Sequence, residues 1–239
     1  MNKIINKYDH NFYLSNEEPC SYISNKKEKK IFTIMDDPQN SNQYEALIKH
    51  GFRRSHNILY NQVCDRCNLC KSLRINCVNF KPSKSQKRIL NKNQNIYKKK
   101  LITKTSLEQF KLFKEYLEFK HQESEMNEMN YSDYKKMLDA PGINTHIYEY
   151  YFNKELVACV ISDFLDDSVS MVYSFYNKEF LKFSIGKYMI LDHFNLAKKI
   201  NKKYVYLGYW VEGCEKMDYK SKFNSSEILI NNTWKDYLI

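Results

Sequence analysis

The pattern of hydrophobic and polar residues predicts helices in the first part of the chain. The clearest one begins near Ser106, where Gln109 three residues later completes a capping box. Apolar residues then recur at helical spacing, at Leu107, Phe110, Phe113 and Leu117. Shorter helices are predicted over residues 43–50, 85–94 and 132–138, with a loop over 121–130 and a strand over 73–80.

After Gly142 the pattern changes to apolar runs separated by short polar turns, which is typical of strands. Strands are predicted over 145–152, 155–164 and 168–176, then a helix over 185–200 and a strand over 204–210. The first three should form an antiparallel meander. We therefore expect an α+β fold, with an N-terminal Cys-containing, basic subdomain (1–104) and a C-terminal domain (105–239).

Strands, a helix and a further strand in this order resemble the acyl-transferring core of the GNAT superfamily. A member that uses acetyl-CoA would carry a Gly-rich loop at the start of the helix, where backbone N–H groups hold the pyrophosphate. The turn here is Phe183-Ser184-Ile185-Gly186-Lys187, with a single glycine. A GNAT-like domain that uses another acyl donor is therefore favoured.

Composition supports a folded chain. Of its 239 residues 43% are hydrophobic and 15% aromatic, whereas glycine (5) and proline (4) are scarce. No run approaches the roughly 20 apolar residues of a membrane helix, and residues 1–10 lack the apolar centre of a signal peptide. We expect a cytoplasmic protein that makes no membrane contact and acts as a monomer.

The net charge of +10 is concentrated in one segment. Residues 66–106 carry twelve basic side chains and no acidic one. Such a localised field is typical of proteins that bind polyanions, nucleic acid above all, although a solvated basic face is the alternative. All five arginines lie between Arg53 and Arg88, which favours bidentate recognition of a carboxylate or phosphate there.

Four cysteines in the first third of the chain are candidate metal ligands. Cys64, Cys67 and Cys70 have the spacing of zinc or iron–sulfur ligands, and Cys20 is a candidate for the fourth position. Cys77 and His56 are alternatives for that position. Redox-sensitive thiols or ordinary buried cysteines would give the same pattern.

Several longer motifs resemble the bacterial aminoacyl-tRNA–protein transferases. They are Cys20-Ser21-Tyr22, with Ser21 where the family usually has proline; Gly51-Phe52-Arg53-Arg54-Ser55-His56-Asn57; the cysteine run; Phe80-Lys81-Pro82-Ser83-Lys84-Ser85-Gln86-Lys87-Arg88; Ser170-Met171-Val172-Tyr173-Ser174-Phe175-Tyr176; Ser184-Ile185-Gly186; Tyr206-Leu207-Gly208-Tyr209-Trp210-Val211-Glu212-Gly213-Cys214; and Lys216-Met217-Asp218-Tyr219-Lys220. The resemblance covers about residues 20–223.

The resemblance implies an enzyme of the N-degron pathway. Such an enzyme transfers an amino acid from charged tRNA to the N-terminus of a protein that begins with Asp or Glu. The bacterial branch usually transfers leucine and its eukaryotic relatives arginine, so leucine is favoured here by analogy. The chemistry is aminolysis of an ester, which needs positioning and modest base assistance and no cofactor.

Candidate roles follow for the residues in these motifs. Arg53 or Arg54 would pair with the acceptor's carboxylate, and a structural salt bridge is the alternative for each. His56 is a candidate proton acceptor, whereas Tyr173, Ser174 and Tyr209 are candidate catalytic residues on strands beside the acyl-transfer cleft. Tyr206 and Trp210 would bind substrate by stacking on the terminal adenine, and Lys216 and Lys220 would bind phosphate or the acceptor chain. The basic helix supplies candidate tRNA-binding residues, namely Lys84, Lys87, Arg88 and Lys92.

Three nearby acidic residues, Asp163, Glu212 and Glu215, bear on the donor, because an arginine donor would need a buried carboxylate and leucine an apolar pocket. Two other functions stay open: an acetyl-CoA-dependent GNAT N-acetyltransferase, and a metal-bearing RNA-binding protein without enzymatic activity.

Overall fold

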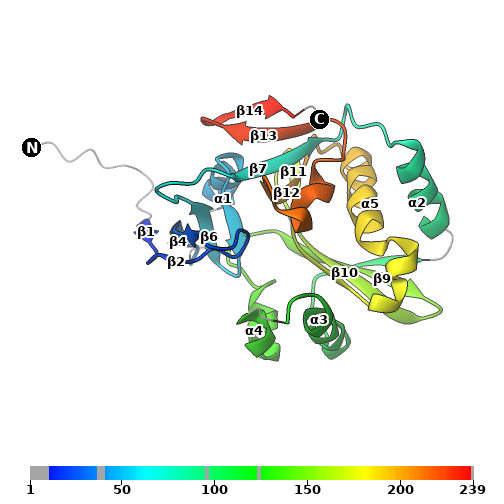
Figure 1. Ribbon diagram of the computed structural model, residues 1–239. Coiled ribbons are helices and arrows are strands. Elements are labelled where there is room, and N and C mark those ends of the chain that lie inside the picture. The colour runs from blue at the N-terminus through cyan, green and yellow to red at the C-terminus, as the bar shows by residue number, and fades with distance from the viewer. Residues whose placement is uncertain (1–10, 37–40, 95–96, 123–124, 238–239) are drawn as a thin grey trace, which may run out of the picture.

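A large mixed sheet organises the chain in the computed structural model, which describes residues 11–36, 41–94, 97–122 and 125–237. The eight-stranded sheet has the order β14-β13-β7-β12-β11-β10-β9-β8 (Figure 1). Its centre is the predicted meander of β9 (Thr145–Phe152), β10 (Glu155–Phe164) and β11 (Ser168–Tyr176). Helix α5 (Ile185–Lys199) then leads to β12 (Tyr204–Val211), which lies parallel to β11. This arrangement confirms the prediction of an α+β fold, with the strands, helix and further strand in the expected order.

The turn between β9 and β10 shows why the meander forms. Asn153 and Lys154 both have positive φ, 48° and 71°, as a two-residue hairpin turn requires. Asparagine tolerates this conformation better than most residues, so the local sequence fits the hairpin.

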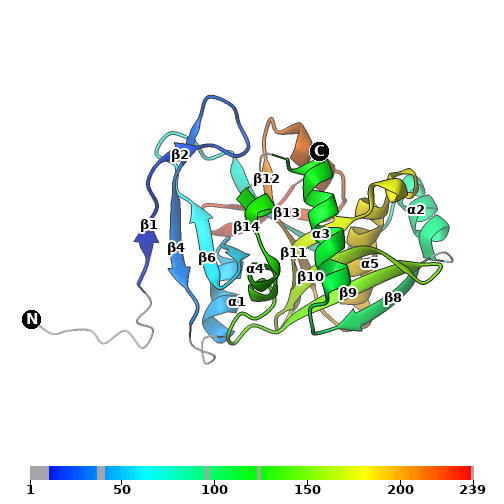
Figure 2. The ribbon, with the colours of Figure 1, turned by 90° about the horizontal axis from the view of Figure 1, so that it is seen from below.

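Helices cover both faces of the sheet (Figures 1 and 2). On one face α5 packs with α2 (Lys84–Gln94), and on the other lie α3 (Leu107–Lys120) and α4 (Tyr131–Lys136). The predicted capping box at Ser106 is present, with the serine side chain accepting from the Gln109 backbone N–H and the Gln109 side chain accepting from the Ser106 backbone N–H. The predicted loop over 121–130 contains a short 3-10 helix, η2 (Glu125–Glu128), and residues 123 and 124 lie outside the described part.

A small sheet of order β1-β4-β6-β5 lies beside the large one. It consists of β1 (Tyr13–Leu14), β4 (Lys30–Ile34), β6 (Ile58–Gln62) and β5 (Arg53–Ser55). Helix α1 (Ser41–Lys49) packs with it through Tyr44 and Ile48 in a third apolar cluster that also contains Tyr206 of β12. A two-stranded ribbon pairs β2 (Glu18–Pro19) with β3 (Lys27–Glu28).

The expected domain boundary at residue 104 does not divide the large sheet. Strand β7 (Cys70–Asn76) pairs with β12 and with β13 (Ser226–Ile230), and β8 (Lys98–Ile102) pairs with β9. Backbone hydrogen bonds of the sheet therefore join the two halves of the chain. Strand β14 (Thr233–Asp236) completes the sheet, and two further 3-10 helices are η3 (Lys178–Phe183) and η4 (Glu215–Lys220).

Within the described residues no helix is long and apolar enough to cross a membrane. The N-terminal residues 1–10, on which the signal-peptide expectation rests, lie outside the described part.

Candidate active site

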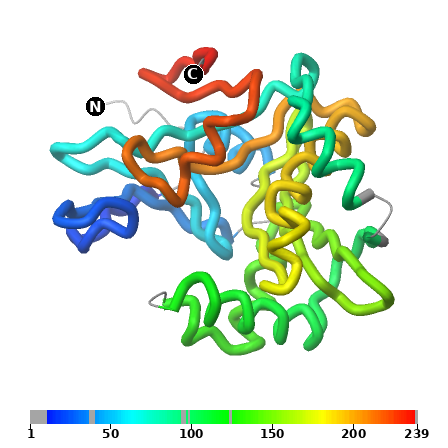
Figure 3. The backbone as a smooth tube through the Cα atoms, turned by 45° about the vertical axis from the view of Figure 1, so that its right-hand side comes forward, coloured from blue at the N-terminus to red at the C-terminus, as the bar shows by residue number. Residues whose placement is uncertain are grey.

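The candidate site lies where β11 and β12 stop pairing and diverge. The end of each strand beyond this point is called its parted half. The parallel ladder joins these strands only from Ser168 and Tyr204 to Ser170 and Tyr206, although both strands continue for several residues. Backbone groups of a strand that has no neighbour are free to bind other partners. In Figure 3, β11, β12 and the η4 segment that follows β12 meet in the middle of the molecule, next to the N-terminal sheet.

Arg53 of β5 reaches both parted strands. Its guanidinium lies directly over Gly208 of β12, because a Cβ at that glycine would be 2.4 Å from Cζ of Arg53. Nη2 of Arg53 is 3.5 Å from the carbonyl oxygen of Met171 on β11. Among the described residues no acidic side chain forms an ion pair with Arg53. The half-buried guanidinium therefore offers its fork to a ligand.

Arg54 points to the opposite side of β5 and is committed to the protein interior. It forms a bidentate ion pair with Asp163, in which both N···O distances are 2.7 Å, and both side chains are at most 1% exposed. Its remaining N–H groups donate to Thr145 Oγ1 and to the carbonyl oxygens of His56 and Met137. All five donors are therefore satisfied, so that of the two arginines only Arg53 keeps N–H groups for a ligand.

Lys220 is a buried amine beside Arg53. Its residue is 8% exposed, and Nζ donates to the carbonyl oxygen of Tyr209 at 2.7 Å. Burial lowers the pKa of Lys220 to about 7, and the positive charge of Arg53 acts in the same direction. This amine is therefore neutral on about half of the molecules near neutral pH. The sequence offered no signal for this, because burial and the neighbouring charge arise only on folding.

Two candidate catalytic residues lie on the parted half of β11. Tyr173 packs edge-to-face against Phe113 and Tyr116 at ring separations of 5.8 and 6.4 Å, and its hydroxyl is buried without a hydrogen-bond partner among the described residues. Burial raises the pKa of Tyr173, so its hydroxyl stays protonated and can only donate or accept hydrogen bonds. Ser174 is partly exposed in the same strand.

Three aromatic residues of β12 are buried in the structure, among them Tyr206 and Trp210, for which stacking on a base was expected. Tyr206 is 3% exposed and packs against Trp234, and Tyr209 is also 3% exposed, with its hydroxyl 3.0 Å from Oδ1 of Asn61. Trp210 is 8% exposed and packs against Tyr237 at 4.9 Å, on the face that holds α5. Their rings are covered by protein, so they offer no open surface to a base.

His56 and Lys216 lie apart from this centre. His56 occupies the turn between β5 and β6 with φ 55°, and its ring is near Arg54 and Asp133 of α4. Burial and the Arg54 charge lower its pKa. Lys216 is exposed on η4, where its charge lowers the pKa of His121. Among the described residues, no hydrogen bond or ion pair joins His56 or Lys216 to Arg53, Tyr173 or Ser174.

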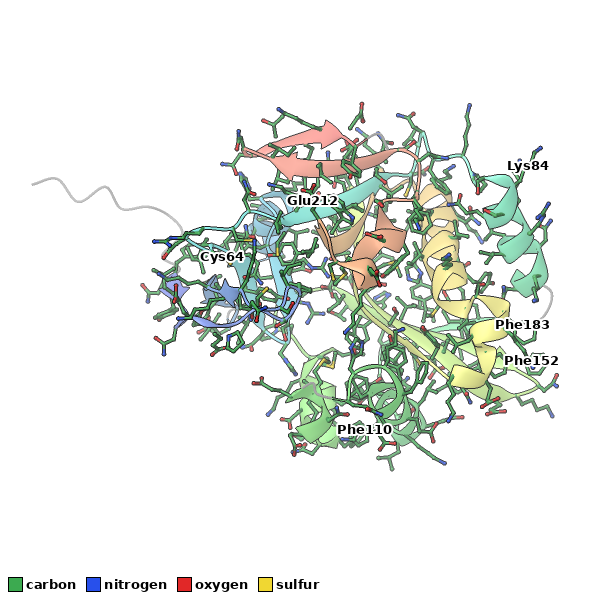
Figure 4. The ribbon with its side chains drawn as sticks, viewed as in Figure 1. Cys64, Lys84, Phe110, Phe152, Phe183 and Glu212 are labelled. Atoms are coloured by element: carbon green, nitrogen blue, oxygen red, sulfur yellow. The ribbon has the colours of Figure 1, made fainter. Side chains whose placement is uncertain are left out.

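The four candidate tRNA-binding residues share the exposed face of α2. Their side chains are solvent-exposed and form no ion pair among the described residues, whereas Ile89 and Leu90 turn inward against the core that α5 forms. In Figure 4 Lys84 marks this helix at the side of the molecule opposite Cys64. Arg74, counted in the same basic segment, is instead buried against Glu227, with an N···O distance of 2.7 Å.

The four candidate metal ligands line one hollow. Cys20 comes from the turn after β2, Cys64 and Cys67 come from the loop between β6 and β7, and Cys70 is the first residue of β7. Burial and the other three cysteines raise the pKa of the Cys70 thiol to about 12. In the described part of the chain no three His, Cys, Asp or Glu side chains are already arranged to hold a metal ion. The donor set nevertheless fits a soft metal, because four thiols from two segments face the same space.

Comparison of the sequence with known protein families gives matches over nearly the whole chain. The family described as arginine-tRNA-protein transferase matches with its N-terminal part over residues 18–88 and with its C-terminal part over residues 108–230. The chain belongs to this family. Its members are aminoacyltransferases, and the parted strands β11 and β12 lie within the C-terminal match.

Individual relatives carry a more specific name. Proteins named aspartate/glutamate leucyltransferase from Rhizobium leguminosarum bv. trifolii and Agrobacterium fabrum are both 38% identical to the chain. Each alignment covers 95% of this chain, and 92% and 94% of the respective relatives. Among solved structures, the crystal structure of FemX aligns with a TM-score of 0.48 at 8% identity, over 79% of this chain and 65% of that one.

Proposed function

We propose that this transferase moves leucine from leucyl-tRNA to the α-amine of proteins that begin with Asp or Glu. The observation that carries the proposal is the unpaired guanidinium of Arg53 at the parting of β11 and β12. A fork of N–H donors at an acyl-transfer site suits an acceptor whose first residue has a carboxylate. The curated relatives bear the same specificity in their name.

The proposed aminolysis requires positioning of the two substrates and hydrogen-bond donors to the oxyanion. The acceptor's α-amine attacks the ester carbonyl of the aminoacyl-tRNA, the C–N bond forms, and the ribose oxygen leaves. Positioning supplies most of the acceleration in such an aminolysis. Backbone N–H groups on the parted half of β11 are candidate donors to the oxyanion, because that half lacks a neighbouring strand on the side of β12.

The surroundings of the acidic residues favour leucine over arginine as the donor. Of the three carboxylates that the sequence suggested, Asp163 is paired with Arg54, and Glu212 and Glu215 are exposed. None of the three offers a buried, unpaired carboxylate to a cationic side chain.

The start of α5 disfavours the acetyl-CoA alternative. A Cβ at Gly186 would be 3.3 Å from the ring of Tyr176, so this ring already lies against the first turn of the helix. The turn therefore lacks the open, glycine-rich backbone that would hold a pyrophosphate.

We also propose that Cys20, Cys64, Cys67 and Cys70 bind zinc or an iron–sulfur cluster with a structural role. A metal there would join the turn after β2 to the loop between β6 and β7, beside the apolar cluster that contains Tyr22, Cys70 and Tyr209. Metal analysis and absorption spectra of the purified protein, compared with a Cys67→Ser variant, test this proposal. A metal content that is the same in both, or absent from the wild type purified without oxygen, would contradict it.

The main test measures transfer of labelled leucine, and in parallel arginine, from charged tRNA to peptides that begin with Asp, Glu or Asn. We expect leucine to move to the Asp and Glu peptides only. Arg53→Ala should lower kcat/KM for the Asp peptide about 10- to 100-fold, because a charge-assisted hydrogen bond contributes about 1.5–3 kcal/mol.

The control is Lys111→Ala, at an exposed lysine of α3, which should keep wild-type transfer. Equal transfer to the Asn and Asp peptides, or an Arg53 variant with wild-type kcat/KM, would sink the carboxylate assignment. Binding of tRNA without transfer of either amino acid would favour an RNA-binding protein.

A further inference from the structure

Lys220 is buried without the partner that a buried lysine usually has. Among the described residues its Nζ has one acceptor, the carbonyl oxygen of Tyr209, and no carboxylate. A buried cation is normally paired, because desolvation disfavours the charged form. The proposed reaction uses Arg53 and backbone N–H groups of β11, and it assigns no function to the Lys220 amine.

The groups that face Lys220 favour its neutral form. Arg53 approaches from β5 and carries a permanent positive charge, whereas the Cys214 thiol, just before η4, acts in the opposite direction. Burial is the largest cause, and the result is a pKa of about 7. A neutral amine keeps a lone pair, and Nζ can hold its hydrogen bond to Tyr209 while that lone pair accepts a proton.

The positions of Arg53 and Lys220 match the two functional groups of one acidic N-terminal residue. Arg53 lies over Gly208, and Lys220 is bound to the carbonyl of Tyr209, the next residue of β12. An N-terminal Asp or Glu carries its carboxylate and its α-ammonium only a few bonds apart. With the carboxylate at the guanidinium, the α-ammonium comes next to a neutral amine, whereas a second cation there would repel it.

We infer that Lys220 accepts the proton of the acceptor's α-ammonium and so produces the nucleophile of the transfer reaction. This inference rests on the proposed function. The lone pair of Nζ takes one proton, and the freed α-amine attacks the ester carbonyl. The C–N bond forms, the C–O bond to the ribose breaks, and the second proton of the attacking nitrogen goes to the ribose oxygen. Lys220 then returns its proton to water, which balances the reaction with one proton released.

The test is the pH dependence of kcat/KM for an Asp peptide in the wild type and in Lys220→Met. We expect the wild-type rate to rise with pH through about 7. The variant should rise only through about 8, the pKa of the α-amine itself. At pH 7 the variant should be about fivefold slower, because about half of Lys220 is then neutral in the wild type, whereas only about a tenth of the α-amine is free in the variant. Above pH 9 the two rates should converge.

Lys220→Arg separates a proton acceptor from a simple cation. Arginine keeps the positive charge at every working pH and cannot accept a proton, so this variant should show the same pH-dependent loss as Lys220→Met. The matched control is Lys222→Met, an exposed lysine two residues further on, which should follow the wild-type profile. Thermal unfolding and tRNA affinity of each variant report on folding and donor binding.

Two results would overturn the inference: a loss in Lys220→Met that is equal at all pH values, or wild-type activity in Lys220→Arg. If neither variant folds, the wild-type profile decides, and a rise near pH 8 would exclude Lys220 as the proton acceptor. Failure of the proposed function is a separate outcome, since the wild type would then transfer no leucine to any peptide.

Discussion

Two adjacent arginines have opposite roles at the scale of single residues. Side chains alternate along a strand, so Arg53 and Arg54 of β5 point to opposite faces. Arg54 meets Asp163, 109 positions further along the chain, whereas Arg53 meets the bare backbone of Gly208. The motif predicted a carboxylate-binding arginine, and only the distant partners show which of the two is free.

The first prediction concerns the buried pair. Arg54→Met leaves the Asp163 carboxylate buried without a cation, and we expect the free energy of unfolding to fall by about 3–5 kcal/mol. Urea denaturation at neutral pH measures it. Arg66→Met, at an exposed position, should change stability by less than about 0.5 kcal/mol. The double variant Arg54→Met/Asp163→Leu should recover part of the loss, and a double variant as unstable as the single one would contradict this account.

At the scale of elements, one glycine of β12, Gly208, leaves the space in which the Arg53 guanidinium lies. Gly208 has φ +80°, and the register of β12 against β7 shifts between Tyr206 and Gly208. The irregularity puts Tyr206 and Tyr209 in clusters on the N-terminal side, whereas Trp210 joins the α5 core. From the sequence, all three rings were expected on a strand beside the acyl-transfer cleft.

This geometry gives a prediction for Gly208→Ala. The new methyl group would meet the Arg53 guanidinium, so we expect Arg53 to be displaced and kcat/KM for Asp peptides to fall at least about tenfold. Gly213→Ala is the matched control, because Gly213 has φ +79° and its Cβ would meet nothing within 4 Å. It should cost about 1–2 kcal/mol of backbone strain and keep its peptide selectivity. Similar kinetic losses in the two variants would show that strain, and not the Arg53 contact, matters.

Most long elements could be predicted because their patterns are local. The meander, α3 with its capping box, and α5 begin and end within a few residues of the predicted limits. Strand β8 was missed because its Lys98-Lys99-Lys100 sequence is polar, which an edge strand tolerates. The C-terminal strands β13 and β14 were also missed, because β13 depends on the edge of β7 and β14 on the edge of β13.

On the scale of the whole molecule, the basic segment is divided by the fold. Lys84, Lys87, Arg88 and Lys92 form an exposed face on α2. Arg74 is stacked 3.7 Å from the centre of the Tyr204 ring and paired with Glu227, and Lys99 is paired with Asp192. Only part of the charge counted in the sequence is therefore available to a polyanion.

The third prediction follows from this division. Changing the four basic residues of α2 to glutamine should weaken tRNA binding and lower the magnitude of the slope of log K against log salt by about 3.6, since each phosphate contact contributes close to 0.9. Fluorescence anisotropy across a salt series measures it. The control changes Lys111, Lys120, Lys135 and Lys136, exposed lysines of α3 and α4, in the same way. Equal losses of tRNA affinity in both variants would mean that α2 is not a specific binding face for tRNA.

The sequence by itself determined the family, the α+β fold with its meander, and the segments that carry arginine, cysteine and lysine. These are properties of local pattern and composition, which any folded form of the chain must keep. Only the tertiary structure decided that Arg53 is free and Arg54 is paired among the described residues, that Gly208 gives Arg53 its place, and that Lys220 is a buried amine with a lowered pKa beside Arg53. Burial, charge proximity and strand parting depend on contacts between residues far apart in the chain, and no local pattern records them.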